Sequence, residues 1–484
     1  SATVARLLQI PVEKLNAELE KRDTKNRKRG FIYLKKQVLP GVVARLKAQK
    51  IHGLAYESSF KRYYTGSDSA AQLVGITNAQ GRGVEGFELA QDRDLRGQIG
   101  KRTIMIDAKG HAVEALDDYL PARDGKDVWL TIDSRLQYLA WRELNAGVTA
   151  NQADGGTVVI LDAKTGEVLA MASNPSYNPN QKIGNVGAAM RNRALTDQFE
   201  PGSTLKPLMM AAALENGVIR ANSQFDVSGG KIKVRDRTFS DTHEYDVLDV
   251  TGVLAKSSNV GAVKVGLLLG AQKMWTTYNT IGFGQPIRTG FPGEAKGKML
   301  PYPVWGDVGT ASASIGYGIS VTALQLARAY TVLSGDGRIR PGSLVRQVAA
   351  PSNNHSLWQG ASVEAPMAEG VPVVLSTVAA QVRRMLIATV SVEGTARLAA
   401  VPGYQVAGKT GTIRRIKDGK YEEGAYQSAF VGMLPAQNPK LVCLVMIDNP
   451  KGDYYAGLVA APVFSRVMSG AARLLQIPPD QAMN

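Results

Sequence analysis

Ser203 and Lys206 are the two residues whose types and spacing most directly suggest chemistry in this chain. Pro201-Gly202 before them is typical of a loop, and the apolar run 208–212 after them predicts a buried helix that begins near Ser203. Residues three apart on a helix share a face, so the hydroxyl and the amine can meet. A serine beside a lysine can act as a nucleophile without histidine. The pattern alone is weak evidence, because the chain holds two other copies, Ser58–Lys61 and Ser228–Lys231.

Two later motifs, Ser257-Ser258-Asn259 and Lys409-Thr410-Gly411, set the Ser203 copy apart. The set Ser-x-x-Lys, Ser-x-Asn and Lys-Thr-Gly is shared by β-lactamases and penicillin-binding proteins. Here the three motifs occur in that order, the first two at predicted helix ends and the third on a predicted strand. Isolated copies of the two shorter motifs begin at Lys164, Ser176 and Ser352. The first of these fits the tip of a hairpin, where glycine turns the chain, and the others lie in polar loops.

Other chemistries find less support in the sequence. The four histidines lack metal-type spacing, so each is predicted to be a surface or structural residue: His52, His111, His243 and His355. Counting alone leaves a Ser-His-Asp triad open, although no Gly-x-Ser-x-Gly elbow supports it. The single Cys443 lies in a buried-strand pattern and excludes an intrachain disulfide or a cysteine-based metal site. The segment 81–86 reads Gly-x-Gly-x-x-Gly but lacks the βαβ context of a dinucleotide site. We predict no metal and no other cofactor.

From residue 125 onward, sequence patterns predict the strands and helices that hold the three motifs. Apolar alternation and turn signals indicate strands at 127–133, 157–161, 167–172, 405–412, 427–433 and 441–447. Helical periodicity begins at Ser134, at the Ser203 motif, around 247–270 with a polar interruption, at 312–333 and near 461. Strands near both ends with helices between them predict a mostly antiparallel sheet flanked by helices, with its first and last strands adjacent. The fold class is α+β.

Length and charge limit the domain count and the partners. At 484 residues the chain has room for roughly two or three domains, and the turn-rich segment 121–126 is the predicted boundary between 1–124 and 125–484. The net charge of +15 fits an anionic partner such as nucleic acid, a membrane surface or an acidic polymer, and it equally fits a basic soluble surface without such a partner. The basic segment 21–29 fits an exposed loop. No nucleic-acid-binding motif occurs, so no nucleic-acid partner is predicted. No apolar run approaches the roughly 20 residues that cross a bilayer.

The three motifs and the sequence around them resemble those of the penicilloyl-serine transferase superfamily and, within it, of the class B penicillin-binding proteins. The segment 191–203 is similar to the septal, division-type members, and the likeness extends over nearly all 484 residues. Other similar segments are Arg62-Tyr63-Tyr64, 83–88 and 174–180. Thr410 departs from the pattern, since septal relatives often have serine there, but both residues carry a hydroxyl. The resemblance implies a transpeptidase domain at 125–484, preceded by an elongated α+β pedestal or dimerisation-type domain at 1–124.

The resemblance also implies a mechanism in which Ser203 attacks the D-Ala-D-Ala carbonyl of a peptidoglycan stem peptide and releases D-alanine. Lys206 would be the base, and burial together with the cation Lys409 would lower its pKa. Ser257 would relay a proton to the leaving amine, and Asn259 would hold the substrate amide. An amine from a neighbouring stem would then take the acyl group, and β-lactam antibiotics would acylate the same serine.

The Lys-Thr-Gly strand is implied to bind substrate. Thr410 and Thr412 would bind the terminal carboxylate, with Lys409 adding positive charge. Gly411 would let the substrate backbone lie close to the strand. The backbone N–H groups of Ser203 and Thr412 would form an oxyanion hole.

The resemblance implies a periplasmic domain of an inner-membrane protein, with an anchor that precedes Ser1 and division-complex membrane proteins as partners. Three alternatives stay open at this point. The chain could be a D,D-carboxypeptidase, a β-lactamase-type hydrolase, or a division scaffold or β-lactam sensor that is acylated without turnover. The 124 residues ahead of the catalytic domain do not suit a compact hydrolase.

Overall fold

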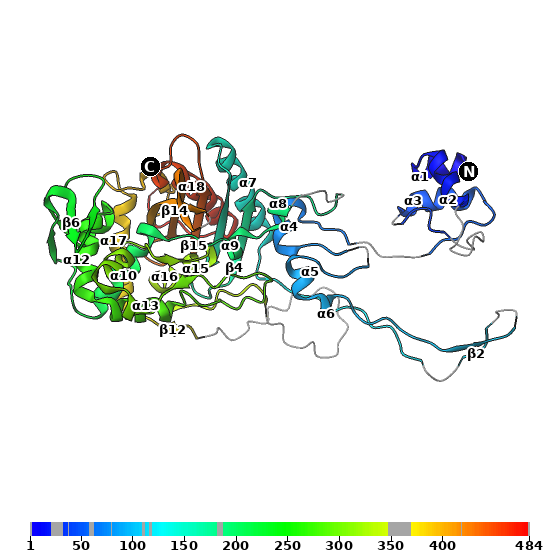
Figure 1. The fold of residues 1–484 in the computed structure, drawn as a ribbon, viewed down its shortest axis with the longest axis horizontal. Helices are drawn as coiled ribbons and strands as arrows, with labels where there is room; N and C mark the ends of the chain where they lie inside the picture. Colours follow the sequence, from blue (N-terminus) through cyan, green and yellow to red (C-terminus); the bar gives the residue numbers. More distant parts are fainter. Residues whose placement is uncertain are drawn as a thin grey trace. The chain divides into compact units, whose positions relative to one another are not determined.

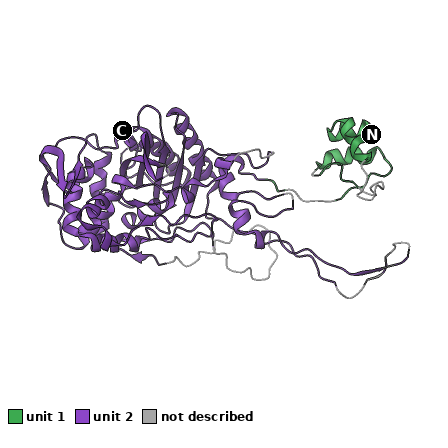
Figure 2. Cartoon of the chain, in the orientation of Figure 1, with its two compact units in different colours: residues 1–63 green, residues 64–484 purple. Residues whose placement is uncertain are grey.

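A computed structural model describes residues 2–20, 32–36, 38–57, 62–78, 80–108, 112–115, 119–181, 187–346, 369–417 and 419–482. The chain forms two compact units, residues 1–63 and 64–484 (Figure 2). The boundary that the sequence predicts at 124/125 stays a prediction. The basic segment 21–29, the pair Ser58–Lys61, Ser352, His111 and His355 lie wholly or partly outside the described residues.

The first unit contains three short helices, α1 (Ala2–Leu8), α2 (Val12–Glu20) and α3 (Pro40–Ala48). Their apolar positions recur at helical spacing and meet in a small core made of Val4, Ala5, Leu8, Leu15 and Leu46. This small core holds the three helices together.

The second unit begins with α4 (Ser67–Val74), α5 (Gly86–Ala90) and α6 (Asp92–Leu95). The glycine-rich segment 81–86 is a tight turn, in which Gly83 bridges Thr77 and α5 begins at Gly86. A Cβ on Gly83 would lie 1.8 Å from the carbonyl oxygen of Glu88, so only glycine fits this close approach.

A five-stranded antiparallel sheet forms the centre of the second unit (Figure 1). Its strand order is β13-β14-β15-β3-β4, and every neighbouring pair is antiparallel. The strands are β3 (Gly155–Asp162), β4 (Val168–Asn174), β13 (Ala407–Lys417), β14 (Lys420–Leu434) and β15 (Leu441–Asp448). Because β15 pairs with β3, the first and last strands of this sheet in chain order are adjacent, which confirms the predicted closure and the α+β class. The first strand of the sheet is the one predicted at 157–161.

Helices cover both faces of this sheet because its strands carry apolar residues on both sides. Val158 and Ile160 face a core shared with α7 (Ser134–Ala150) and α18 (Ala456–Leu474), while Val159 belongs to the core on the other face. The Asp133 carboxylate caps α7 by accepting bonds from the backbone N–H groups of Arg135 and Leu136, as its position before the helix favours.

The remaining elements are short. The helices are α8 (Gly187–Met190), α9 (Arg193–Thr196), η1 (Gly202–Leu205), α10 (Lys206–Glu215), η2 (Ser228–Gly230), α11 (Val250–Ala255), α12 (Asn259–Leu269), α13 (Ala271–Ile281), η3 (Tyr302–Val304), α14 (Gly306–Ser314), α15 (Ala323–Ala329), α16 (Thr331–Ser334), α17 (Ser376–Ile387), η4 (Ala388–Val390) and η5 (Arg397–Ala399). The strands are β1 (Ile104–Ile106), β2 (Ala112–Ala115), β5 (Gln224–Asp226), β6 (Lys231–Val234), β7 (Arg237–Ser240), β8 (Val247–Asp249), β9 (Lys298–Met299), β10 (Ile319–Ser320), β11 (Arg338–Ile339) and β12 (Val371–Pro372). None of the helices in the described part of the chain is both long and apolar enough to span a bilayer.

The strand predicted at 127–133 is wrong. Only an isolated bridge joins Leu130 to Val345, because this segment changes partners along its length. The Thr131 N–H donates to Leu344, whereas the Asp133 N–H donates to Leu169. No single neighbouring strand among the described residues accompanies it far enough to form a ladder.

We expect Phe464→Ala to destabilise the second unit. The Phe464 ring is fully buried on α18 and meets Phe430 edge-to-face, with ring centroids 4.7 Å apart. Its loss should lower the free energy of unfolding by about 3–5 kcal/mol, measured by urea denaturation followed by circular dichroism. Leu458→Ala is the matched control, since Leu458 lies on the same helix but is 50% exposed. Equal effects of the two substitutions would contradict this packing.

Candidate active site

Ser203 lies in η1, the short 3-10 turn that leads directly into α10. The predicted placement of Ser203 at the start of a helix is therefore confirmed. Gly202 has a positive φ of 54°, and its N–H donates to the carbonyl of Gly316 at 3.1 Å. A Cβ on Gly316 would lie 2.1 Å from the Gly202 carbonyl oxygen. The Gly316 turn thus supports the backbone next to Ser203 through an approach that excludes larger residues.

Lys206 begins α10 and its side chain is fully buried. Its Nζ donates to the Ser257 carbonyl at 2.6 Å and to Asn259 Oδ1 at 2.8 Å, and it lies 3.4 Å from Ser257 Oγ. The first two motifs therefore meet in space.

Ser257 lies in the break between α11 and α12, which confirms the predicted polar interruption. Its backbone has a left-handed φ of 60°, which is uncommon for a residue other than glycine and costs conformational energy. Ser258 then caps α12, its Oγ accepting from the Gly261 N–H at 2.9 Å. This break turns the Ser257 carbonyl and hydroxyl toward Lys206.

Lys409 completes the cluster from the central sheet. It lies on β13 opposite Val431 and its side chain is fully buried. Its Nζ donates to Ser257 Oγ at 2.9 Å and to the Thr410 carbonyl at 3.3 Å. Ser257 Oγ is therefore within reach of two lysine amines, one from each of the other motifs.

The residues after Lys409 run past the Ser203 turn. A Cβ on Gly411 would lie 2.8 Å from Thr204 Cγ2 and 3.2 Å from the Pro201 carbonyl oxygen. The absence of a side chain at Gly411 thus allows β13 to pack against η1, which brings the strand next to Ser203. The role expected for this glycine, to leave room for substrate, stays a prediction.

The two threonines of this strand contact other parts of the fold. Thr410 Oγ1 lies 2.9 Å from Thr395 Oγ1, and Thr412 Oγ1 accepts from the Ala456 N–H at 3.0 Å. These contacts hold the two hydroxyl oxygens in place within the fold.

Burial dominates the electrostatics of the two lysines. It lowers the pKa of Lys206 well below its usual value, and the positive charge of Lys409 lowers it further. Asp241 opposes this effect and raises the Lys206 pKa. Burial also lowers the pKa of Lys409 to about 7. Amines with such pKa values can be neutral near pH 7 and can then accept a proton.

Asp241 also belongs to the candidate site, although the sequence did not indicate it. Its carboxylate accepts from Ser258 Oγ at 2.6 Å and from the backbone N–H of Val260 at 2.9 Å, and it also accepts from the Asn259 N–H. It therefore holds the second motif in place. No local pattern marks it, because it follows β7 and reaches the motif only through folding.

Glu200 is a second missed residue. It is buried just before the Ser203 turn, and its carboxylate accepts from the Gly318 N–H at 2.7 Å and from the Tyr421 hydroxyl at 2.8 Å. These bonds attach the segment before Ser203 to the Gly316–Gly318 turn and to the β13–β14 hairpin. In the sequence, Glu200 stood out only as a member of the segment 191–203, which resembles the septal relatives.

The competing motif copies lie elsewhere. Lys164 follows β3 in a turn where Asp162 Oδ1 accepts from the Lys164 and Thr165 N–H groups, as expected for a hairpin. Ser228 lies in η2, and its partner Lys231 is exposed on β6. The Ser176 hydroxyl donates to the Asp68 carbonyl at 2.6 Å in a loop contact.

Comparisons with known proteins agree with this geometry. The family model of the penicillin binding protein transpeptidase domain matches residues 156–469, and that of the penicillin-binding protein dimerisation domain matches residues 1–130. The probable peptidoglycan D,D-transpeptidase PenA of Neisseria meningitidis is 36% identical over 483 residues, which are 99% of this chain and 79% of that protein. The peptidoglycan D,D-transpeptidase FtsI of Escherichia coli is 37% identical over 479 residues, covering 99% of this chain and 77% of that protein.

A solved structure extends the likeness to three dimensions. The apo transpeptidase domain of penicillin-binding protein 3 from Burkholderia pseudomallei superposes with a TM-score of 0.65 at 36% identity, covering 73% of this chain and 98% of that one. The family models together account for most of the sequence, and the relatives match it almost from end to end. The chain therefore belongs to the class B penicillin-binding proteins, the family of peptidoglycan D,D-transpeptidases of the FtsI and PenA type.

Proposed function

We propose that this protein is a peptidoglycan D,D-transpeptidase that cross-links stem peptides during septal wall synthesis through an acyl-enzyme on Ser203. The observation that carries the mechanism is the buried contact of Lys206 and Lys409 with Ser257, beside the turn that holds Ser203. The septal assignment draws support from the similarity to FtsI.

In the acylation step, Ser203 Oγ attacks the carbonyl of the D-Ala-D-Ala bond and passes its proton to neutral Lys206. A neutral amine has two N–H donors and one lone pair. The Ser257 carbonyl and Asn259 Oδ1 account for two donated bonds from Lys206 Nζ. The lone pair is then left to accept the serine proton.

Collapse of the tetrahedral intermediate breaks the peptide bond and leaves an ester on Ser203. The leaving D-alanine amine needs a proton, which Ser257 Oγ gives and recovers from Lys206. Lys409 Nζ, 2.9 Å away, donates to this same hydroxyl and so orients it. The ester is then attacked by an amine of a second stem peptide, which forms the cross-link and restores the Ser203 hydroxyl.

The oxyanion hole in this scheme consists of the backbone N–H groups of Ser203 and Thr412. The close packing of Gly411 against Thr204 supports it, because that contact brings the two backbone segments together. Each such donor typically contributes about 10²–10³ in rate.

The remaining motif residues bind the substrate. Thr410 and Thr412 hold the terminal carboxylate, with the positive charge of Lys409 nearby when it is protonated. Asn259 Nδ2 donates one bond to the Ser240 carbonyl at 2.8 Å, and its second N–H is available to the substrate amide.

We also propose that residues 1–124 serve as a pedestal or dimerisation-type domain and residues 125–484 as the transpeptidase domain, on the periplasmic side of the inner membrane. The match of the dimerisation model to residues 1–130 supports the first assignment. The net charge of +15 suits work near anionic lipid and cell wall, with division-complex membrane proteins as partners.

Fluorescent penicillin should attach to the native protein and fail to attach to Ser203→Ala. The reason is that Ser203 has a buried lysine base one turn away. Ser228→Ala is the matched control, because Ser228 has the same spacing to a lysine but an exposed one, and it should label like the native protein. Gel fluorescence and mass spectrometry of the labelled peptide give the readout. Labelling of Ser203→Ala at the native level would contradict the assignment of Ser203 as the nucleophile.

A thioester stem-peptide analogue offered with a D-amino-acid acceptor should yield the aminolysis product. This outcome distinguishes a transpeptidase from a hydrolase, because both form the same acyl-enzyme but only the former passes it to an amine. Exclusive hydrolysis would favour the carboxypeptidase alternative, and a stable acyl-enzyme without product would favour the sensor.

Asp241→Asn should shift the acid limb of the acylation rate to lower pH. Lys206 acts as a base only when neutral, so the rate falls as the pH drops through its pKa. The Asp241 charge raises that pKa, so its removal lowers it and keeps the amine neutral at lower pH. The plateau rate should fall about ten- to a hundredfold, because the Ser257 loop loses charged hydrogen bonds that fix its position.

The measurement is the rate of fluorescent penicillin attachment as a function of pH. Asp236→Asn is the control, since Asp236 is exposed in the turn between β6 and β7, and its profile should match the native one. An acid limb that stays in place or moves to higher pH in Asp241→Asn would refute the electrostatic role.

A further inference from the structure

Residues 98–123 contain a two-stranded structure, called the ribbon below, that belongs to no larger sheet in the described part of the chain. It comprises β1, β2 and the bridges Gln98–Arg123 and Lys101–Leu120. It runs out from the body of the second unit (Figure 1), and each of its strands has one strand neighbour among the described residues. A lone two-stranded ribbon is marginally stable in water, and its open edges can accept a further strand.

The ribbon also exposes large apolar side chains. Ile99 is the most exposed large hydrophobic residue in the described part of the chain, at 88%. The others on the ribbon and its flanks are Ile104, Met105, Val113, Tyr119 and Leu120. Apolar surface gathered on one slender element is typical of a contact site rather than of a solvated surface.

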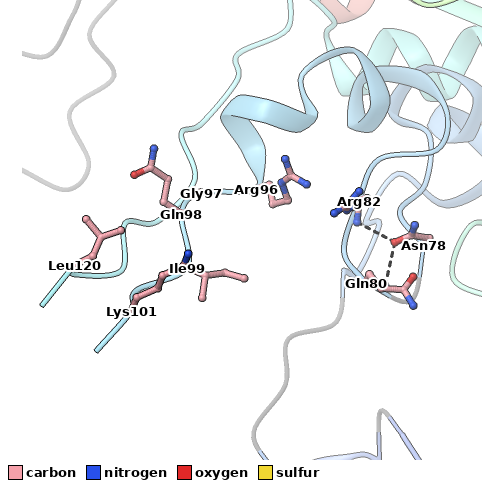
Figure 3. Close-up of a pocket in the computed structure, with 9 residues that line it drawn as sticks. All are labelled: Asn78, Gln80, Arg82, Arg96, Gly97, Gln98, Ile99, Lys101 and Leu120. Carbon is pink, nitrogen blue, oxygen red and sulfur yellow. Dashed lines mark hydrogen bonds between the residues drawn. The ribbon is translucent and has the colours of Figure 1, made fainter. Parts of the chain in front are cut away.

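A positively charged cavity of about 880 Å³ lies at the root of the ribbon (Figure 3). Arg82, Arg96 and Lys101 line it, and Ile99 and Leu120 contribute apolar lining. No carboxylate is among its described lining residues. It includes no residue of the cluster around Ser203, so its size does not mark the catalytic centre.

Among the described residues, Arg82 and Lys101 form no ion pair, so the charges of these two cations are available to a ligand. The turn that carries Arg82 is held by Asn78, whose Oδ1 accepts from the backbone N–H groups of Gln80 and Arg82, each at 3.0 Å (Figure 3). Arg96 makes a partly exposed pair with Asp92 at 3.6 Å, which is too long and too hydrated to neutralise it strongly.

We propose that the ribbon and this cavity form a docking surface for an extended segment of a partner polypeptide that carries apolar residues and at least one carboxylate. The carboxylate enters the cavity between Arg82 and Lys101, and the apolar residues cover Ile99 and Leu120. The partner backbone adds along the open edge of the ribbon, the usual mode for an extended peptide on a free strand. A polyanion without apolar groups would leave the exposed Ile99 uncovered. This surface shares no described lining residue with the cluster around Ser203, so its role is separate from the proposed transpeptidase activity.

A phage-displayed library of random peptides tests this surface with the full chain as bait. The library is first depleted on the double variant Arg82→Glu/Lys101→Glu and then selected on the native chain. We expect the enriched peptides to combine carboxylates with alternating apolar residues. A synthetic copy of an enriched peptide should lose affinity by about tenfold or more against the double variant and against Ile99→Asp, and should bind more weakly at high salt.

Lys273→Glu is the matched control, because Lys273 is an exposed cation on α13, and binding should be unchanged. Every variant must still attach fluorescent penicillin at the native rate, which separates failure of this surface from failure of the active site. No enrichment after depletion, enriched peptides without carboxylates, or equal binding of oligoglutamate or of anionic lipid vesicles would each overturn the proposal.

Discussion

The burial of two lysine amines against one serine hydroxyl is the constraint on which the catalytic unit depends. Lys206 and Lys409 are both fully buried, and Ser257 Oγ lies within reach of both. Two ammonium ions in such a place would repel each other and lose their hydration, which is costly. The fold accommodates the amines by lowering their pKa values and by surrounding Lys206 with carbonyl oxygens. The lowered pKa of Lys206 is also what its proposed role as the base requires. The arrangement that makes burial of the two lysines tolerable for the folded state is therefore the same one that the proposed proton transfer needs.

Much of this geometry could be predicted from the sequence because it is encoded locally. The order of the three motifs, the polar break at 256–258 between two helices, and the C-terminal strands follow from patterns a few residues long. The adjacency of the first and last strands of the sheet could also be predicted, since an antiparallel sheet with helices between its strands leaves few other arrangements.

Features that depend on distant partners could not be predicted. Asp241 contributes to the site because β7 ends beside the second motif, and Glu200 because a hairpin and a turn converge on it. The segment 127–133 has the alternation of a strand but finds no continuous neighbour among the described residues. For Gly411, the sequence indicates that a side chain is excluded at this position. It does not indicate that Thr204 is the residue that occupies the space beside it. Residue type alone does not reveal which side of a strand is crowded.

The pairing of β15 with β3 has a consequence for biosynthesis. Lys409 reaches Ser257 only after β13, β14 and β15 have joined a sheet whose other strands were synthesised much earlier. Strand pairs so far apart in the sequence are slow to form, because closing the long intervening chain costs entropy. A nascent or truncated chain that ends before β13 carries Ser203 and Lys206 but lacks the strand that closes the centre. The proposed reactivity toward penicillin therefore requires the finished chain, and its appearance would report completion of the fold.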